Sequence, residues 1–315
     1  MNRIITLTVN PAIDKSTTVD GIVPNKKLRC STPLFDAGGG GVNVSRAIKK
    51  LGGESLCVHL SGGHTGHILQ NLLQTEKVDQ KVIPIKDWTR ENLSVTDTKN
   101  NQQYRFVLPG AKVEKNEWQE VLKTLKETLT EGDILVASGS LPVDIPDHFY
   151  EKVASLCHEN RVKLILDTSG EPLLMAARSK VFMLKPNLGE LSLLCGVSAI
   201  SVLELEDLAK QFLEKNTCEV LVISLGAKGA LLATKNLIEH VPAPAVHQKS
   251  TIGAGDCMVA GMVFSLAQGK SLKEMVGYGV ACGSAATMNP GTQLCKKEDA
   301  DRLYHWIRSH QKTLS

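Results

Sequence analysis

The stretch NEWQEVLKTLKETLTEGDILVASGSLPVDIPDHFYEKVASLCHENRVKLILDTS, residues 116–169, decides the fold class. It alternates two helix-like segments, 116–132 and 147–160, with two apolar, β-branched runs, 133–139 and 162–169. Similar strand-like runs occur elsewhere along the chain, at 4–10, 55–61, 181–187 and 219–226. Strands joined through helices lie parallel, and continuously apolar strands are covered by helices on both faces. The sequence therefore predicts an α/β fold with a mostly parallel central sheet between two layers of helices.

Two segments interrupt the alternation, at about 13–36 and 88–108. Neither has a helix pattern between its strand-like pieces, and SVTDTKNNQQYRFVL, residues 94–108, is typical of a β-hairpin with a polar turn. We expect the two segments to pair into a small antiparallel sheet that closes over the strand ends as a lid. An edge extension of the main sheet is the alternative. The chain, 1–315, is then a single domain with a discontinuous β lid.

Composition narrows the function classes. The net charge of +3 comes from scattered lysines rather than a basic tract, which disfavours a nucleic-acid partner. The eight cysteines form no C-x-x-C pair and mostly lie in apolar runs, so we expect reduced, buried thiols. The N-terminus lacks a signal-peptide pattern, and no apolar run approaches membrane-spanning length. We expect a soluble, cytoplasmic protein that does not associate with membranes.

A run of four glycines, Gly38 to Gly41, precedes a helix-like segment that contains Asn43. Such a turn allows a ligand to approach the backbone, and the helix start offers free N–H groups. The Lys-Ser/Thr of a P-loop and the spacing of a dinucleotide fingerprint are both absent. A flexible turn packed tightly on the sheet remains the alternative.

LKPNLGEL, residues 184–191, ends a strand and begins a helix. Asn187 and Glu190 are three residues apart and share one face of the helix start. The pair could hold a hydrated magnesium ion through water, or it could form a capping box. The spacing fits both equally well.

STIGAGDCM, residues 250–258, places three small residues and then Asp256 at the start of an apolar helix. Free N–H groups at the positive end of a helix dipole form an anion site, and an adjacent carboxylate can accept a proton from a hydroxyl. Together they suit phosphoryl transfer to an alcohol. A plain helix cap at Asp256 is the alternative.

Weaker signals lie in three other places. Arg90 and Arg105 fall in the expected lid and are of the type that clamps phosphate, although arginines are also common on solvated strands. ASGSLP, residues 137–142, ends a core strand with small polar residues, where ligands lie in parallel sheets. Gly226 and Gly229 form a turn that could pass beneath a nucleotide or be an ordinary loop.

The motifs GGGGVNVSRAI, SGSLP, LKPNLGEL, SLGAKGALL and STIGAGDCMVAG, in this order, resemble the ribokinase-like, or PfkB, family of sugar kinases over nearly the whole chain. Within the family, KDWTRENL, QYRFVLPGA and VACGSAATMNPGTQLC are similar to the bacterial type-2 6-phosphofructokinase branch. The resemblance implies a ribokinase-like fold and ATP-dependent phosphorylation of fructose 6-phosphate at its 1-hydroxyl. Tagatose-6-phosphate kinase and 1-phosphofructokinase are alternatives, the latter disfavoured by Gly40. A non-catalytic sugar-phosphate or nucleotide sensor is the alternative from another class.

The resemblance also implies roles for individual residues. Asp256 would be the base, and the N–H groups of Gly253, Ala254 and Gly255 would hold the transferring phosphoryl group. The sugar phosphate would be bound by Asp14, Gly39, Asn43, Arg90, Arg105 and Ser140. The ATP site would comprise Lys185, Asn187, Ser224, Gly226, Gly229 and Ser284, with Glu190 ordering the hydration shell of Mg²⁺. A potassium ion would bind oxygens around Ser250, Ile252, Ala286, Asn289 and Gly291.

The resemblance also has implications for dimer formation and for two positions at which this sequence differs from the branch. Lys27 stands where the branch contacts a nucleotide at a dimer interface, and we expect a homodimer through the lid, because an isolated small sheet exposes edges and an apolar face. Gln248 and Gln293 stand where the branch has serine and arginine. They change nucleotide contact or potassium affinity only if side chains, rather than backbone oxygens, act at those positions.

Overall fold

The structure is a computed structural model that describes residues 2–201 and 203–311. Its centre is a nine-stranded sheet in the order β13-β12-β11-β10-β9-β8-β1-β4-β5. Seven of the strands, from β11 to β5 in this order, run parallel. Their bounds are β1 Ile4–Thr8, β4 Leu56–Ser61, β5 Asp79–Pro84, β8 Ile134–Ser138, β9 Lys163–Asp167, β10 Met183–Leu184 and β11 Val220–Ser224.

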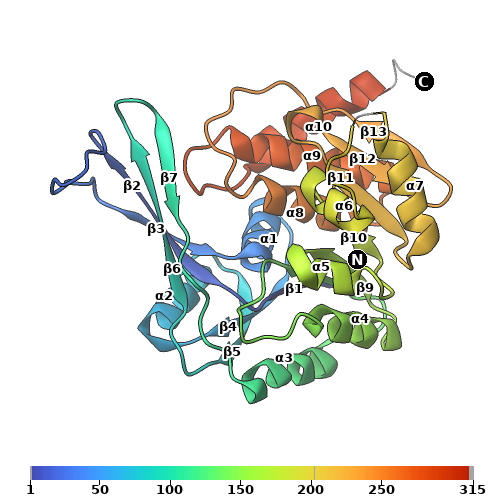
Figure 1. Cartoon of the computed structure of the whole chain (residues 1–315), viewed down its shortest axis with the longest axis horizontal. Helices are drawn as coiled ribbons and strands as arrows, with labels where there is room; N and C mark the ends of the chain where they lie inside the picture. The colour runs from blue at the N-terminus through green and yellow to red at the C-terminus, as the bar shows by residue number, and fades with distance from the viewer. Residues whose placement is uncertain (1, 202, 312–315) are drawn as a thin grey trace.

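Helices cover both faces of this sheet (Figure 1). Along β8, Leu135 and Ala137 pack into one core cluster while Ile134 and Val136 pack into the other, so neither face meets water. This double burial explains the unbroken apolar strand runs and confirms the α/β class. One layer holds α3 Lys115–Thr128, α4 Phe149–Glu159, α5 Gly170–Ala176, α6 Leu188–Cys195 and α7 Leu205–Lys215. The other holds α1 Gly40–Lys50, α8 Ala254–Ala267, α9 Leu272–Thr287 and α10 Lys297–Gln311.

The last two strands of the sheet depart from the expected pattern. β12, Ala230–Ala233, and β13, Ile238–Val241, are antiparallel to their neighbours and extend the sheet as a meander. The apolar run 181–187 contains only two strand residues, because the chain leaves the sheet after Leu184 to begin the turn into α6. The central sheet is therefore mostly, but not wholly, parallel.

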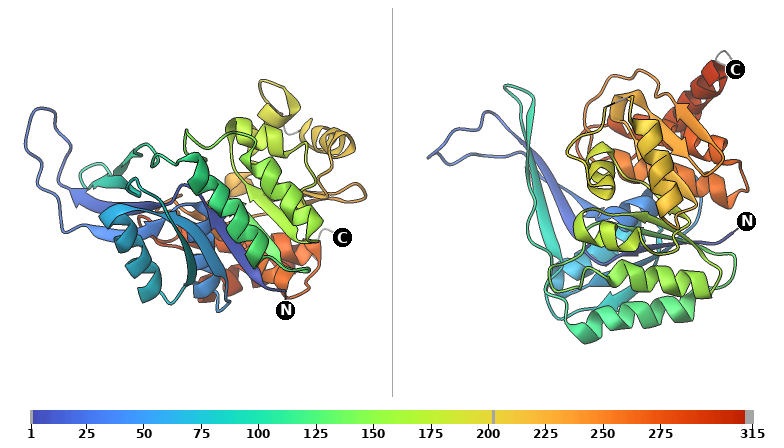
Figure 2. Two further views of the ribbon diagram at one scale, coloured as in Figure 1. Left: turned by 90° about the horizontal axis from the view of Figure 1, so that it is seen from below. Right: turned by 45° about the vertical axis from the view of Figure 1, so that its right-hand side comes forward.

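The two interrupting segments form a separate small sheet at one side of the molecule (Figure 1). Its strand order is β3-β2-β6-β7, with bounds β2 Ala12–Val19, β3 Leu34–Gly38, β6 Arg90–Asp97 and β7 Gln102–Phe106. The predicted hairpin is confirmed, because β6 and β7 pair antiparallel around the turn at residues 98–101. The expectation of a purely antiparallel sheet was wrong, since β2 and β6 pair in parallel. The loop between β2 and β3 projects beyond the sheet in all views (Figures 1 and 2).

The small sheet is anchored to the main body by α2, Gly63–Thr75. Ile13, Ala37, Leu69 and Leu73 share one small core cluster between this helix and the sheet. Further out along β3, Leu34 and Phe35 are exposed, whereas β2 is half-buried from Asp14 to Thr17 and ends at the buried Val19. The small sheet therefore packs against α2 at one end of its strands.

The cysteine expectation was mostly confirmed. All eight cysteines are free thiols and six are buried, but Cys30 is exposed in the β2–β3 loop and Cys195 is half-buried. Among the described residues, no helix is both long and apolar enough to cross a membrane.

Candidate active site

The start of α8 lies at the carboxyl edge of the central sheet and leaves its N–H groups open. Gly253 is the N-cap residue, with φ 73°, and no side chain caps the helix. Among the described residues, the N–H groups of Gly253, Gly255 and Asp256 meet no protein acceptor. Ala254 N–H donates a long 3.3 Å bond to the Thr251 carbonyl. The positive end of the helix is therefore available to an anion.

Asp256 is the third residue of α8 and does not cap it, so the plain-cap interpretation was wrong. Its Oδ2 accepts a 2.9 Å hydrogen bond from Asn43 Nδ2 of α1. The α1 helix also begins without a side-chain cap, at Gly39 with φ 108°. The glycine run packs tightly here, since a Cβ on Gly40 would lie 2.3 Å from Ser138 Oγ. Close packing therefore brings the two glycine-led helix starts together, and with them Asn43 and Asp256.

The surroundings of Asp256 favour proton acceptance near neutral pH. Burial raises the pKa of its carboxyl to about 6, while the Asn43 N–H acts to lower it. A carboxyl with this pKa is mostly ionised at pH 7 yet more basic than an exposed aspartate, as a general base requires.

Lys185 directly follows β10, and its side chain extends to the start of α8. Its ammonium lies 3.1 Å from Asp167 Oδ1, and its side chain is 6% exposed. Burial lowers the pKa of Lys185, but the carboxylates of Asp167, Glu190 and Asp256 together more than offset this, so the pKa lies above its ordinary value. A Cβ placed on Gly255 would be 3.9 Å from the Lys185 Nζ. A permanent positive charge thus stands beside the open end of α8.

Asn187 and Glu190 form a complete capping box at the start of α6. Asn187 Oδ1 accepts from Glu190 N–H at 2.9 Å, and Glu190 Oε2 accepts from Asn187 N–H at 2.8 Å. Burial raises the pKa of Glu190 above its ordinary value. Among the described residues, Glu190 Oε1 has no protein donor, so one carboxylate oxygen is still available to a water or an ion.

A cavity of about 520 Å³ opens beside the α8 start. Four of the residues expected at the ATP site line it: Ser224, Gly226, Gly229 and Ser284. Gly229 has φ 96°, and a Cβ there would lie 2.0 Å from the Val241 carbonyl, so only glycine fits this turn. The remaining wall is Ala227, Ala243, Pro244, Ala245, Val246, Gln248, Thr251, Ala254, Gly255, Met258, Val280, Gly283 and Thr287. An apolar slot with a few polar atoms suits a flat heterocycle and its ribose.

Arg90 and Ser140 meet through Asn10, on the side of the site that faces the small sheet. Asn10 Nδ2 donates to Ser140 Oγ at 3.1 Å, and Arg90 Nη2 donates to the Asn10 carbonyl at 3.2 Å. Arg90 Nη1 donates to the Leu108 carbonyl at 3.2 Å. In the described part of the chain, Arg90 Nε, Asn10 Oδ1 and Thr8 Oγ1 are buried with no partner. Buried polar atoms without partners are rare and mark a place where a ligand can supply them.

Asp14 extends this group onto β2 of the small sheet. Its Oδ1 accepts from Asn92 Nδ2 at 2.8 Å, and burial raises the pKa of its carboxyl. A Cβ on Gly38 would lie 2.3 Å from Asp14 Oδ2, so the first glycine of the run leaves room for this side chain.

Two expected residues stand apart from the others. Arg105 lies on the exposed strand β7, paired with Ser94, so that it shares a sheet face with Asp14 but lies further out. Lys27 lies exposed in the projecting loop between β2 and β3. Neither contacts the α8 start within this single chain.

The residues expected around potassium lie on two adjoining segments. Ser250 Oγ donates to the Gly291 carbonyl at 2.8 Å, and Lys249 N–H donates to the Thr287 carbonyl at 2.8 Å. The side-chain amide of Asn289 donates to the carbonyls of Ala285 and Leu294. Because the side-chain nitrogen of Asn289 is engaged in these hydrogen bonds, Asn289 could bind a cation only through its oxygen atoms. The described residues contain no cluster of His, Cys, Asp or Glu suited to a metal.

Comparison with known proteins places the chain in a family. Residues 5–299 match the family described as pfkB family carbohydrate kinase. The chain is 41% identical over 309 residues to ATP-dependent 6-phosphofructokinase isozyme 2 of Escherichia coli K12, covering 98% of this chain and 99% of that protein. It is 40% identical over 302 residues to isozyme 2 of Mycobacterium tuberculosis H37Rv, covering 96% and 89%. The chain belongs to the PfkB family of carbohydrate kinases.

Solved structures agree with this placement. Phosphofructokinase-2 of E. coli in complex with potassium matches this PfkB kinase with a TM-score of 0.94 and 40% identity over 98% of this chain and 100% of that one. Its complex with fructose-6-phosphate gives a TM-score of 0.92 at the same coverage, as does its tetrameric inhibited form. Identity is lower to the 1-phosphofructokinase of Borreliella burgdorferi, at 32% over 97% of each chain. It is 28% to the tagatose-6-phosphate kinase of Staphylococcus epidermidis, over 96% and 98%.

Sequence reasoning missed several residues of this PfkB kinase that the fold brings to the site. Asn10 follows β1 and Asp167 is the last residue of β9, so both lie at the carboxyl edge of the sheet. Their position after apolar runs was a usable signal, because side chains at that edge converge. Arg46, which contacts Asn43, carried no signal, since a lone arginine within a helix usually points to solvent.

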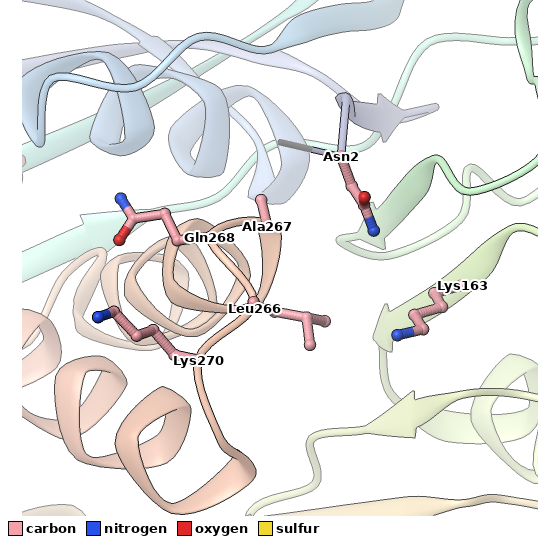
Figure 3. Close-up of a pocket in the computed structure, with 7 residues that line it drawn as sticks. Asn2, Lys163, Leu266, Ala267, Gln268 and Lys270 are labelled. Atoms are coloured by element: carbon pink, nitrogen blue, oxygen red, sulfur yellow. The ribbon is translucent and has the colours of Figure 1, made fainter.

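The opposite edge of the same sheet carries a second hollow, of about 650 Å³ (Figure 3). It lies between the N-terminus of β1, the start of β9 and the end of α8. Its lining contains no carboxylate, histidine or cysteine, and the labelled side chains diverge around an open surface. The residues are Asn2, Lys163, Leu266, Ala267, Gln268, Gly269 and Lys270. The lining of this hollow therefore supplies lysine ammonium groups but no general base for phosphoryl transfer.

Proposed function

We propose that this PfkB kinase phosphorylates fructose 6-phosphate at its 1-hydroxyl with ATP, giving fructose 1,6-bisphosphate and ADP. The observation that carries the proposal is the pairing of a basic carboxylate with an open helix end in one place. Asp256 has a pKa raised to about 6 by burial, and the free N–H groups of Gly253 and Gly255 lie beside it. Identity to the two 6-phosphofructokinases exceeds that to the related sugar-phosphate kinases, which favours fructose 6-phosphate as the substrate.

In the proposed mechanism, Asp256 takes the proton of the sugar 1-hydroxyl as that oxygen bonds to the γ-phosphorus of ATP. The bond from phosphorus to the bridging oxygen breaks, and ADP leaves with the electron pair. Open N–H groups at the start of α8 and the ammonium of Lys185 stabilise the charge on the transferring group. Arg90, Arg105, Ser140, Asp14, Gly39 and Asn43 would hold the sugar phosphate. Ser224, Gly226, Gly229 and Ser284 would hold the adenosine part of ATP.

Two ions accompany this proposal. Asn187 and Glu190 would hold Mg²⁺ through its water shell, for which the free Glu190 Oε1 is suited. Mg²⁺ would neutralise charge on the ATP phosphates. Potassium would bind oxygens of Ser250, Ile252, Ala286, Asn289 and Gly291. The hydrogen bond between Ser250 and Gly291 already holds these two segments together without using any carboxylate.

We further propose that the small sheet acts as a lid within a single domain spanning 1–315, and that two copies of the chain pair through it. Register aligns Phe35, Lys15, Leu93 and Phe106 in one row across the four strands. The three apolar members are 38–53% exposed, which is unusual for a face of a small sheet. A partner sheet would cover them, and Lys27 in the projecting loop would contact a second nucleotide at that interface. Free thiols suit a cytoplasmic location.

The test compares ATP turnover with fructose 6-phosphate, tagatose 6-phosphate and fructose 1-phosphate in parallel. We expect the highest kcat/KM with fructose 6-phosphate and the new phosphate on its 1-oxygen. Preference for tagatose 6-phosphate or fructose 1-phosphate would move the assignment to the corresponding relative. Binding without ADP production from any of the three would identify a sensor and overturn the proposal.

A further inference from the structure

Arg46 is a buried arginine that none of the proposed binding or catalytic roles uses. It lies on α1 one turn after Asn43, on the same side of the helix, and its side chain is 3% exposed. Arginine is rarely buried this deeply unless its whole guanidinium group is partnered.

All five N–H groups of this guanidinium have acceptors. Nε and Nη2 donate to Glu76 Oε1 at 2.9 and 2.6 Å, and Nη2 also donates to Asp36 Oδ1 at 2.9 Å. Nη1 donates to the Ala37 carbonyl at 2.6 Å and, over a longer 3.4 Å, to Asn43 Oδ1. Acceptors from β3, α1 and the end of α2 therefore fix the plane of the guanidinium.

This arrangement determines which way the Asn43 amide faces. Arginine can only donate hydrogen bonds, and an ionised carboxylate can only accept them. An amide between the two must turn its oxygen to Arg46 and its N–H to Asp256, as the contacts of 3.4 and 2.9 Å show. The reversed amide would place its N–H against the cation and its oxygen against the carboxylate.

The same network reaches the C-terminal part of the chain. Asp36 Oδ2 accepts a 2.6 Å hydrogen bond from Thr292 Oγ1, next to Gly291. In the register of the small sheet, Asp36 on β3 lies opposite Asp14 on β2. Through Asp36, Arg46 thus connects α1 with the small sheet and with the loop around residue 291, next to the proposed base Asp256.

We infer that Arg46 is a positioning residue for phosphoryl transfer, acting through Asn43 to hold the Asp256 carboxylate toward the sugar hydroxyl. The inference rests on the proposed function. In this role Arg46 does not contact the substrate directly. Its rival is a purely structural role, in which Arg46 only holds the elements together.

A double-mutant cycle on kcat separates the two. We expect Arg46→Lys, which keeps the charge but loses the fork, to lower kcat about 10–100-fold, the cost of losing one hydrogen bond to a charged group. In the Asn43→Ala background the same change should have less than about a twofold effect, because the residue through which it acts is gone. Equal effects in both backgrounds would overturn the inference, as would an unchanged kcat for Arg46→Lys.

Arg3→Lys is the matched control. Arg3 also makes a forked contact, to Asp133 at 3.2 and 2.6 Å, but at the opposite edge of the sheet. We expect this variant to keep its kcat. If it lowers kcat as much as Arg46→Lys does, loss of any ion pair is sufficient and the inference fails.

Asp36→Asn keeps the inference testable if Arg46→Lys does not fold. Asp36 is partly exposed, and the variant weakens one contact of Nη2 while retaining an oxygen acceptor. We expect kcat to fall about 3–10-fold, with no further fall in the Asn43→Ala background. Additive effects would again overturn the inference.

The pH profile of kcat/KM gives an independent readout. Burial raises the pKa of Asp256 and the Asn43 N–H lowers it, so an amide that turns away lets the pKa rise. The acid limb should therefore move to higher pH in Arg46→Lys and not in Arg3→Lys. The other charged groups facing Asp256 are Asp167 on β9, Lys185 after β10 and Asp14 on β2, and both variants leave them in place. An unmoved limb would contradict the inference, whereas a parent protein inactive on all three sugar phosphates would defeat the proposed function itself.

Discussion

The starts of α8 and α6 both bring a carboxylate near the ammonium of Lys185 and are built in opposite ways. At α6, Asn187 and Glu190 satisfy each other's N–H groups in a closed capping box. At α8, Gly253 brings no side chain, and the first N–H groups stay open apart from the long bond from Ala254. The capped end gains stability from its own side chains. The open end forgoes that stability and leaves its donors free for a ligand, which supports the proposed anion site at α8.

The same comparison indicates different roles for the carboxylates of Glu190 and Asp256. Glu190 has one oxygen engaged in the cap, while Asp256 faces the site and, among the residues that the structure describes, has only the Asn43 side chain as a hydrogen-bond donor. Burial raises the pKa of both. Glu190 is therefore suited to hold position, and Asp256 is free to accept a proton.

The largest expected effect follows from Asp256→Asn. The variant keeps the shape of the side chain but removes the base, so kcat should fall about 10²–10⁴-fold with little change in sugar-phosphate affinity. The unchanged protein should itself lose activity below about pH 6, where Asp256 becomes protonated. Steady-state kinetics from pH 5 to 8 measures both. An unaltered kcat would remove Asp256 from the chemistry and cancel the contrast with Glu190.

A smaller effect follows from closing the open helix end. Gly253 has φ 73°, and a Cβ there would lie 2.9 Å from Leu294 Cδ2. Gly253→Ala should therefore shift the N–H donors and lower kcat about 10–100-fold, besides costing about 1–2 kcal/mol of backbone strain.

Gly269→Ala at the other end of α8 is the matched control for that variant. Gly269 has φ 75° and nothing within 4 Å of an added Cβ, so the strain is similar but the site is remote. Urea unfolding should show comparable losses of stability in the two variants. The proposed anion site would be wrong if the two variants also lost kcat equally.

Sequence patterns were sufficient for what local chemistry determines. Apolar runs separated by helices predicted six of the seven parallel strands but missed β5, and GAGD located the open start of α8. The sequence reasoning missed the antiparallel turn into β12, although the short connection through Gly226 and Gly229 excludes the long crossover that a parallel strand needs. The pattern could not give the parallel pairing of β2 with β6, since nothing local encodes a register between segments so far apart.

The candidate site shows the same division. Asp256 and Asn43 were found from their own motifs, but the hydrogen bond between them depends on the packing of α1 against α8. Asn10 is part of the site only because β1 lies beside β8, which leads into the loop with Ser140. The Lys185–Asp167 pair needs β9 and β10 to be neighbours. Contacts that depend on strand order cannot be read from one segment.

The smallest effect tests the closed helix end. Asn187→Ala removes the acceptor for Glu190 N–H and should cost about 1 kcal/mol of stability. It should also raise the KM for ATP a few-fold while leaving kcat nearly unchanged, because we place phosphoryl transfer at α8. Ser271→Ala opens an equivalent capping box at α9, beside the amino edge of the sheet, and provides the comparison.

Both variants should lose similar stability in urea unfolding, but only Asn187→Ala should change the KM for ATP. If Ser271→Ala raises that KM equally, the effect is a general loosening of the helices. If Asn187→Ala instead lowers kcat as strongly as Gly253→Ala, the capped and open ends act as one catalytic unit. The contrast between them would then describe two halves of a single anion site, with Glu190 as much a part of the chemistry as Asp256.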